Sequence, residues 1–217
     1  MMSEQIEWYF DFISPFSYLQ WRRLRRHNPA LVARLVAKPV LLAGLLNHWG
    51  QLGPAELPGK RKHTYRQVLF QARALDIRLQ VPPAHPFNPL PALRLCLAAP
   101  DRVSAVHAIF AHVWEDGHAA DSVDALAELA RALHVDDPVA AIAAPAVKQE
   151  LAANGADAIA LQVFGVPTIV IDGELFWGND ATAMAQAYLD DRTLFDTPEM
   201  RRIDSLPAAA ERPRAKA

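Results

Sequence analysis

Cysteine is almost absent from this sequence. Cys96 is the only one in 217 residues, so no intrachain disulfide is possible. It stands in the apolar, helix-like stretch A-L-R-L-C-L-A-A, which favours a buried structural role over a reactive one. Thiol–disulfide exchange by a pair of protein cysteines is therefore excluded.

Long apolar runs and an excess of charge are also missing. No stretch reaches the roughly 18–20 apolar residues that a membrane helix needs, and the N-terminus lacks the basic start and apolar middle of a signal peptide. The formal net charge of −2 gives no electrostatic reason to expect a nucleic acid as partner. We therefore expect a cytoplasmic protein that binds neither membrane nor nucleic acid.

Motifs of several other enzyme classes are not found either. The sequence has no G-x-G-x-x-G, no Walker loop and no G-x-S-x-G elbow, which argues against nucleotide binding and against a serine hydrolase. His107, His112 and His118 are spaced by five and six residues, so they do not share the helix face of an H-E-x-x-H motif. We expect no metal site.

What the sequence does contain is strands near both ends and a helical block between them. Apolar runs with turn signals predict the strands, and alanine- and leucine-rich stretches with helical spacing predict the helices. The predicted segments are a strand at 6–13, a helix opened by Ser14-Pro15 and ended by Asn28-Pro29, a strand within 31–42, four to six helices between 43 and 161, strands at 166–171 and 174–177 around an Asp172-Gly173 turn, and a helix from Ala181 to about Leu189.

Four motifs resemble one known family. They are D-F-I-S-P-F-S-Y, L-L-A-G-L-L, A-H-P-F-N-P and F-G-V-P-T-I-V-I-D-G-E-L-F-W-G-N-D. Together with the element order, they resemble the 2-hydroxychromene-2-carboxylate isomerases and their relatives, the kappa-class glutathione transferases, over roughly residues 5–190. The resemblance implies an α/β, thioredoxin-like fold with a large all-helical insertion, of the DsbA and kappa glutathione transferase type.

The resemblance also implies how the chain is divided. Residues 1–43 and 162–192 would form the thioredoxin-like domain, and residues 44–161 would form the inserted helical domain. Residues 193–217 are rich in proline, alanine and charge, so we expect a mobile tail. The family suggests a homodimer.

The implied activity is a glutathione-dependent isomerisation in the breakdown of aromatic compounds. The substrate would be 2-hydroxychromene-2-carboxylate or a related aromatic carboxylate, and the product trans-o-hydroxybenzylidenepyruvate. Glutathione is the implied cofactor, and its thiolate would add reversibly to the substrate so that a double bond becomes rotatable. Two alternatives stay open: a kappa-like glutathione transferase or peroxidase, and a glutathione- or peptide-binding module without catalysis.

Ser14 is the implied catalytic residue. In the redox relatives a cysteine occupies its place, whereas in this family the serine assists the thiol of glutathione. A helix N-terminus favours negative charge, and the Ser14 hydroxyl can donate a hydrogen bond to a thiolate. The alternative is that Ser14 only caps the helix. Ser17, which matches the second redox cysteine, is expected to be structural.

Four further positions, all within the motif that begins F-G-V-P-T, are implied to bind glutathione. The resemblance implies a cis bond between Val166 and Pro167, with the Val166 backbone turned toward the site. Asn179 and Asp180 open a helix whose free N–H groups suit a carboxylate, and Asp180 could meet the γ-glutamyl ammonium group. The alternatives are an ordinary trans proline and a simple aspartate N-cap.

The remaining implied contacts lie in the helical block, at Phe16 after Ser14, and at Trp177 before Asn179. Gln51 replaces the usual asparagine that contacts glutathione, and it is one methylene longer. Lys60 matches a lysine that pairs with a glutathione carboxylate, with Lys62 as the near alternative; a solvated surface cluster is the other reading. The residues expected to line the aromatic substrate pocket are Phe16, Asn88 and Trp177, and His85 could share the surface of Asn88.

Overall fold

The computed structural model describes residues 6–207, and this part of the chain divides into two compact units. The first unit ends at Thr182 and the second begins at Ala183. The candidate site described below lies entirely in the first unit. No helix among the described residues is both long and apolar enough to cross a membrane.

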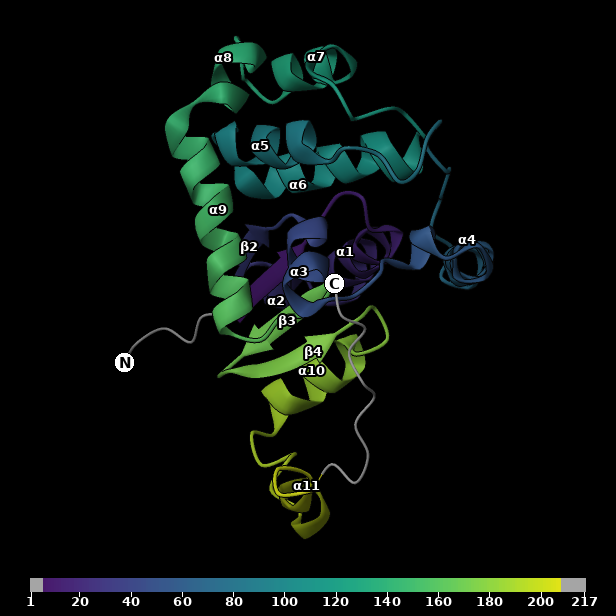
Figure 1. The fold of residues 1–217 in the computed structure, drawn as a ribbon, viewed down its shortest axis with the longest axis vertical. Coiled ribbons are helices and arrows are strands. Elements are labelled where there is room, and N and C mark those ends of the chain that lie inside the picture. The colour runs from purple at the N-terminus through teal and green to yellow at the C-terminus, as the bar shows by residue number, and fades with distance from the viewer. Residues whose placement is uncertain (1–5, 208–217) are drawn as a thin grey trace. The chain divides into compact units, whose positions relative to one another are not determined.

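A four-stranded mixed sheet in the order β2-β1-β3-β4 forms the centre of the first unit (Figure 1). β1 (Ile6–Phe10) runs parallel to β2 (Leu35–Pro39) and antiparallel to β3 (Thr168–Ile171), which pairs antiparallel with β4 (Glu174–Trp177). β3 is buried throughout, as expected of an inner strand covered on both faces, and the edge strand β4 is mostly exposed. The predicted thioredoxin-like fold of the DsbA type is confirmed.

Local sequence signals account for the connections of this sheet. The parallel pair β1 and β2 needs a crossover, which α1 (Pro15–His27) and the short α2 (Pro29–Val32) supply. Between β3 and β4, Asp172 and Gly173 both have positive φ angles, of 54° and 87°, as a tight hairpin turn requires.

The chain between β2 and β3 is helical. These helices lie along the sheet and beyond it, with α5 packed against α6 and α9 in contact with β2 (Figure 1). In chain order they are α3 (Leu42–Trp49), η1 (Pro54–Glu56), α4 (Pro58–Ala74), α5 (Leu90–Ala98), α6 (Arg102–Phe110), η2 (Ala111–Glu115), α7 (Val123–Ala132), α8 (Pro138–Ala143) and α9 (Pro145–Ala160).

This block holds more helices than the four to six that the sequence predicts. Seven α-helices occur among its described residues, together with the 3₁₀ turn η1 and the π turn η2. Prolines explain the difference, because Pro54, Pro58, Pro138 and Pro145 each stand in the first turn of a helix. At that position a proline loses no N–H that the helix needs. A proline that the sequence suggests as the end of one helix can therefore be the beginning of the next.

An aromatic core joins the sheet to the helices. Trp8 stacks on Phe10 at 4.3 Å and on Trp21 of α1 at 5.2 Å between ring centroids. Phe12, just beyond β1, packs against Phe110 of α6 at 4.7 Å. These side chains are almost completely buried, so the turn that follows β1 rests on a rigid base.

One buried amide, that of Gln20, connects three parts of the first unit. Its Oε1 accepts a hydrogen bond from Trp8 Nε1 at 2.7 Å, and its Nε2 donates to the Gly178 carbonyl and to Thr182 Oγ1, both at 3.0 Å. Gln20 therefore uses its acceptor and both donors to join α1, β1 and the turn after β4.

The second unit holds most of α10 (Thr182–Asp190) and all of α11 (Pro198–Ile203). Thr197 caps α11, since its hydroxyl accepts a hydrogen bond from Met200 N at 3.2 Å. The sequence does not predict this helix within the expected tail, and residues 208–217 lie outside the described residues. The mobility of the tail and the expected domain boundaries stay predictions.

Candidate active site

Ser14 lies where β1 runs into α1, at a position that is only 6% exposed. Its hydroxyl caps α1 by accepting a hydrogen bond from Ser17 N at 3.2 Å, and Pro15 occupies the first helical turn. The described residues offer no acceptor for the hydroxyl's own proton. Ser14 can therefore cap the helix and still donate one hydrogen bond to a ligand.

The peptide before Ser14 is fixed from several sides. The Ser14 N–H donates to the Asp11 carbonyl at 3.0 Å, and the Phe12 carbonyl accepts from Trp114 Nε1 at 2.7 Å. The Ile13 carbonyl lies 2.7 Å from His85 Nε2. Because each main-chain group here has a buried or half-buried partner, the position of the Ser14 hydroxyl is strongly determined.

Asp11 is a functional candidate that sequence reasoning missed. Its fully buried carboxylate accepts hydrogen bonds from Ile13 N at 3.1 Å and from Leu42 N at 2.9 Å. The second bond caps α3, whose own N-cap residue Leu41 provides no side-chain cap. Burial raises the pKa of Asp11 to about 7, although these hydrogen bonds act to lower it. An aspartate three residues before the Ser14 cap was the available sequence signal.

The Val166–Pro167 peptide bond is cis, as the resemblance implies. The pair precedes β3, and the antiparallel register that places Thr168 opposite Tyr9 continues toward Asp11. On its other side, the Pro167 carbonyl accepts a hydrogen bond from Gly178 N at 2.8 Å. The segment thus lies between the turn that carries Ser14 and the turn that carries Asn179.

Asn179 is buried, and its side chain is already engaged. Its Nδ2 donates to Gln71 Oε1 of α4 at 3.1 Å, and its Oδ1 accepts from Arg23 of α1 at 3.2 Å. A ligand contact from this residue would therefore use the main chain. Asp180 is exposed, and its carboxylate lies so close to Gly178 that a Cβ there would be 2.4 Å from Oδ1. Only glycine fits at 178, where φ is also +96°.

The expected substrate-pocket residues lie in different environments. Trp177 is 52% exposed and packs on Phe164 at 5.0 Å between ring centroids, so it is not a core residue. Phe16 is partly buried on the first turn of α1. Asn88 is exposed, and its Oδ1 accepts a hydrogen bond from the main-chain N–H of Leu90, the first residue of α5, at 3.2 Å. Trp177 is thus exposed at the end of β4, Phe16 lies two residues after Ser14, and Asn88 has a local structural contact.

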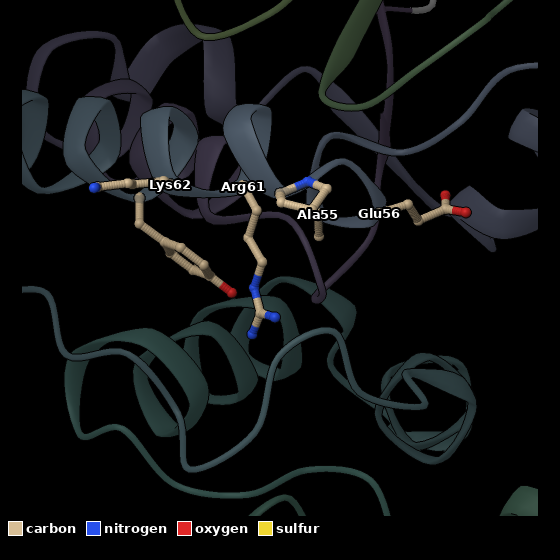
Figure 2. Close-up of a pocket in the computed structure, with 6 residues that line it drawn as sticks. Ala55, Glu56, Arg61 and Lys62 are labelled. Carbon is tan, nitrogen blue, oxygen red and sulfur yellow. The ribbon is translucent and has the colours of Figure 1, made fainter.

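A pocket of about 400 Å³ lies beside the start of α4 (Figure 2). Lys62 contributes to its wall and Lys60 does not, and both lysines are exposed on the helix. In Figure 2, Lys62 and Glu56 extend in opposite directions, away from the guanidinium group of Arg61. Gln51 is exposed, and its main-chain N–H donates to the Leu46 carbonyl at 2.8 Å. The full lining is Ala55, Glu56, Pro58, Arg61, Lys62 and Tyr65.

Two side chains connect this pocket to the Ser14 turn. Tyr65 Oη, in the pocket wall, lies 2.6 Å from His85 Nδ1, and His85 Nε2 lies 2.7 Å from the Ile13 carbonyl. Burial lowers the pKa of His85, and the positive charge of Arg61 adds to that effect. The sequence suggests His85 only as a loop residue near Asn88, and no signal in it points to Tyr65.

No group of three His, Cys, Asp or Glu side chains that could hold a metal ion is present in residues 6–207. The side chains that the structure brings together here are one hydroxyl at a helix N-terminus, the charged residues of the pocket and the hydrogen-bonded pair His85 and Tyr65.

The chain matches known proteins over most of its length. The family model of the DSBA-like thioredoxin domain matches residues 5–190. A 2-hydroxychromene-2-carboxylate isomerase from Pseudomonas putida is 29% identical over 194 residues, which are 84% of this chain and 92% of that protein. Glutathione s-transferase kappa 2 from Caenorhabditis elegans is 31% identical over 78 residues, which are 36% of this chain and 35% of that protein.

The same architecture occurs in a solved structure. The structure of a selenomethionine 2-hydroxychromene-2-carboxylate isomerase has a TM-score of 0.73 and 24% sequence identity, and the match covers 93% of this chain and 99% of that chain. The chain belongs to the DSBA-like thioredoxin domain family and, within it, is similar along most of its length to the 2-hydroxychromene-2-carboxylate isomerases.

Proposed function

We propose that the protein catalyses the glutathione-dependent isomerisation of 2-hydroxychromene-2-carboxylate, or of a related aromatic carboxylate, to trans-o-hydroxybenzylidenepyruvate. The observation that carries the proposal is that Ser14, and no thiol, stands at the N-terminus of α1. Cys96 is buried, and burial raises the pKa of its thiol to about 12. A reactive thiol therefore has to come from outside the chain.

Ser14 is suited to stabilise such a thiolate. The first N–H groups of α1 and the helix dipole favour a negative charge at this end of the helix. The Ser14 oxygen accepts from Ser17 N, which leaves the hydroxyl proton free to point at a sulfur atom. A hydrogen bond to the charged form lowers the pKa of the ligand thiol, so that more of it is ionised at neutral pH.

The surrounding residues fit glutathione, a tripeptide with two carboxylates and one ammonium group. Lys62 in the pocket wall can pair with one carboxylate, and the exposed carboxylate of Asp180 can pair with the ammonium group. The Val166 backbone, next to the Ser14 turn, can pair with the cysteinyl residue as an added strand would. When bound, glutathione supplies a thiolate that adds to the conjugated double bond, makes it rotatable and leaves again.

The similarity to 2-hydroxychromene-2-carboxylate isomerases along most of the chain supports the isomerase. The shorter match to a kappa glutathione transferase supports a second candidate, transfer of glutathione to an electrophile. Both activities use the same thiolate site, and they differ in whether the sulfur stays on the product. Turnover of 2-hydroxychromene-2-carboxylate without formation of a conjugate separates them.

The test is an ultraviolet assay of 2-hydroxychromene-2-carboxylate with and without glutathione, combined with a conjugation assay on 1-chloro-2,4-dinitrobenzene. We expect isomerisation only when glutathione is present, and slow conjugation or none. Equal rates without glutathione would remove the cofactor from the proposal. Conjugation without isomerisation would replace the isomerase by a transferase.

A further inference from the structure

The hydrogen bonds of His85 determine which of its ring nitrogens carries a proton. The Ile13 carbonyl can only accept, so the contact of 2.7 Å requires a hydrogen on Nε2. A neutral imidazole then has a lone pair on Nδ1, which accepts from the Tyr65 hydroxyl at 2.6 Å. The burial that lowers the pKa of His85 keeps this neutral form populated at neutral pH.

The same bonds determine what Tyr65 can offer to a ligand. Its single proton is directed to His85 Nδ1, since the other contact, to the His85 carbonyl, is longer at 3.3 Å. The phenolic oxygen keeps its lone pairs, and the residue lines the pocket beside α4. Tyr65 can therefore accept a proton from a bound hydroxyl group while it passes its own proton to His85.

Arg61 gives this part of the pocket a positive charge. It is one helical turn before Tyr65 on α4, its guanidinium carbon lies 5.8 Å from the Tyr65 ring centroid, and its Nη2 donates to the His85 carbonyl at 2.8 Å. A guanidinium group binds carboxylates well. Arg61 and Tyr65 together thus match a ligand that carries a carboxylate and a hydroxyl on the same carbon, as carbon 2 of 2-hydroxychromene-2-carboxylate does.

We propose that Tyr65 exchanges a proton with the hydroxyl on carbon 2 of the substrate, that Arg61 binds the neighbouring carboxylate, and that His85 is the positioning residue that takes up the Tyr65 proton. The inference rests on the proposed function, and it assigns the Arg61 side of the pocket to the substrate. Lys62, which extends away from Arg61 in Figure 2, is left for glutathione.

The proton transfer accompanies the opening of the substrate ring. The substrate hydroxyl gives its proton to Tyr65 Oη as the Tyr65 proton moves to His85 Nδ1, and the hydroxyl oxygen forms the carbonyl. The bond between carbon 2 and the ring oxygen breaks, and its electron pair stays on that oxygen as a phenolate. The proton returns from His85 through Tyr65 to this oxygen, so that the residues end as they began and no other reactant is needed.

Tyr65→Phe and His85→Gln test the pair separately. Phenylalanine removes only the hydroxyl, and a glutamine at 85 can still donate to the Ile13 carbonyl and accept from Tyr65, but its amide oxygen is too weakly basic to take up the Tyr65 proton. Each is expected to lower kcat about a hundredfold with little change in KM for the substrate and in glutathione affinity. Tyr9→Phe, which removes a hydroxyl bonded to Glu7 in the sheet, is the matched control and should keep the wild-type kcat.

Arg61→Gln should act differently, by raising KM for the substrate about tenfold or more with a smaller effect on kcat. Arg66→Gln is its control, because Arg66 is an exposed arginine on the same helix that does not line the pocket. Equal KM changes in both variants would overturn the role of Arg61.

Nitrogen NMR of histidine-labelled protein provides a readout that does not depend on activity. The resonances lost in His85→Gln identify His85. We expect a neutral ring with the proton on Nε2 at pH 7, and a higher His85 pKa in Tyr65→Phe, since a hydrogen bond donated to Nδ1 favours the neutral form. A proton on Nδ1, or an unchanged His85 pKa in Tyr65→Phe, would contradict the hydrogen bond that Tyr65 donates to His85.

Failure of this inference can be told from failure of the proposed function. A wild-type protein that isomerises the substrate with glutathione, and a Tyr65→Phe variant with the same kcat, would reject the inference alone. A wild-type protein with no glutathione-dependent isomerisation would reject the proposed function, and the assignment of Tyr65 to that reaction with it.

Discussion

Ser14 and Lys62 are both candidates to bind glutathione, yet their surroundings are opposite. Ser14 is 6% exposed, and the peptides before it are held by Asp11, His85 and Trp114. Lys62 is exposed on α4, and Figure 2 shows its side chain extended away from Arg61. A buried side chain on a hydrogen-bonded backbone loses little freedom when a ligand binds, whereas an exposed lysine acts in water and must be ordered. We therefore expect thiolate chemistry to depend on Ser14, and glutathione affinity to be tuned only weakly by Lys62.

Between these two glutathione candidates, the larger effect is expected for Ser14→Ala. Loss of a hydrogen bond to a charged sulfur costs about 1.5–3 kcal/mol, which corresponds to an increase of about one to two units in the pKa of the bound thiol. Turnover at neutral pH should then fall about 10- to 100-fold. The measurement is a titration of thiolate absorbance in the glutathione complex, together with kcat.

Ser17→Ala is the matched control for this comparison. Ser17 is buried on the same helix, and its hydroxyl has no hydrogen-bond partner in the described part of the chain. Its removal should leave both the thiol pKa and turnover unchanged. If the two alanine variants titrate like the wild type, Ser14 is only a helix cap.

The next effect concerns Asp11 and the pH dependence of stability. Its pKa is about 7 in the folded protein, against 3.8 for an unperturbed aspartate, so between these values the folded state holds a proton that the unfolded state has lost. The contribution of Asp11 to the free energy of unfolding therefore falls as pH rises from about 4 to about 7. Asp11→Asn removes this slope. It should also destabilise the protein by about 1–3 kcal/mol, because Ile13 N and Leu42 N donate to different carboxylate oxygens and the amide replaces one of these acceptors by a donor.

Denaturant unfolding between pH 4.5 and pH 8 measures this slope. Asp101→Asn is the control, since Asp101 is an exposed cap of α6 and hydrogen bonds from Ser104 hold its pKa below the ordinary value. That variant should keep the wild-type slope in this range. A wild-type slope in Asp11→Asn would show that Asp11 is ionised throughout.

A smaller effect is expected on the exposed side of the comparison. Lys62→Ala should weaken glutathione binding about two- to fivefold, because an exposed ion pair contributes about 0.2–1 kcal/mol, and the loss should shrink at high salt. Lys60→Ala should have no effect, since Lys60 does not line the pocket. Calorimetry on both variants at two salt concentrations makes the measurement, and a larger loss in Lys60→Ala would reverse the assignment.

The smallest effect is expected for Cys96, a buried group that takes no part in the proposed chemistry. Its pKa of about 12 and its burial predict that iodoacetamide leaves it unmodified in the folded protein at neutral pH. Activity should be unchanged after such treatment, as mass spectrometry and the isomerase assay can show. Inactivation with labelled Cys96 would contradict the conclusion that the reactive thiol is external.

The sequence predicts the Ser14 side of the molecule well. The strand before Ser14, the Ser14-Pro15 start of α1 and the Asp172-Gly173 turn are local signals, and the structure contains all three. The cis bond before Pro167 came from the resemblance and is also present. The predicted contacts of individual residues with glutathione and substrate stay predictions.

What could not be predicted depends on contacts between distant segments. Tyr65 meets His85 across 20 positions, and Asp11 caps α3 from 31 positions away. Neither pairing leaves a mark in the local sequence, because each depends on how α3 and α4 pack. Asn179 shows the same limit, since its amide is engaged by Gln71 and Arg23 and is not free for a ligand.

The buried amide of Gln20 has a consequence for which thiols the site can select. It joins α1 to the Gly178 carbonyl and to Thr182, so the helix that begins at Ser14 and the turn that carries Asp180 move together. The backbone that carries the Ser14 hydroxyl and the backbone that carries the Asp180 carboxylate are therefore held close to one fixed separation. A ligand that touches both ends must have the right length between its sulfur and its ammonium group. We expect cysteine, which is shorter, to reach only one end at a time, and we therefore expect the site to bind glutathione more tightly than smaller thiols.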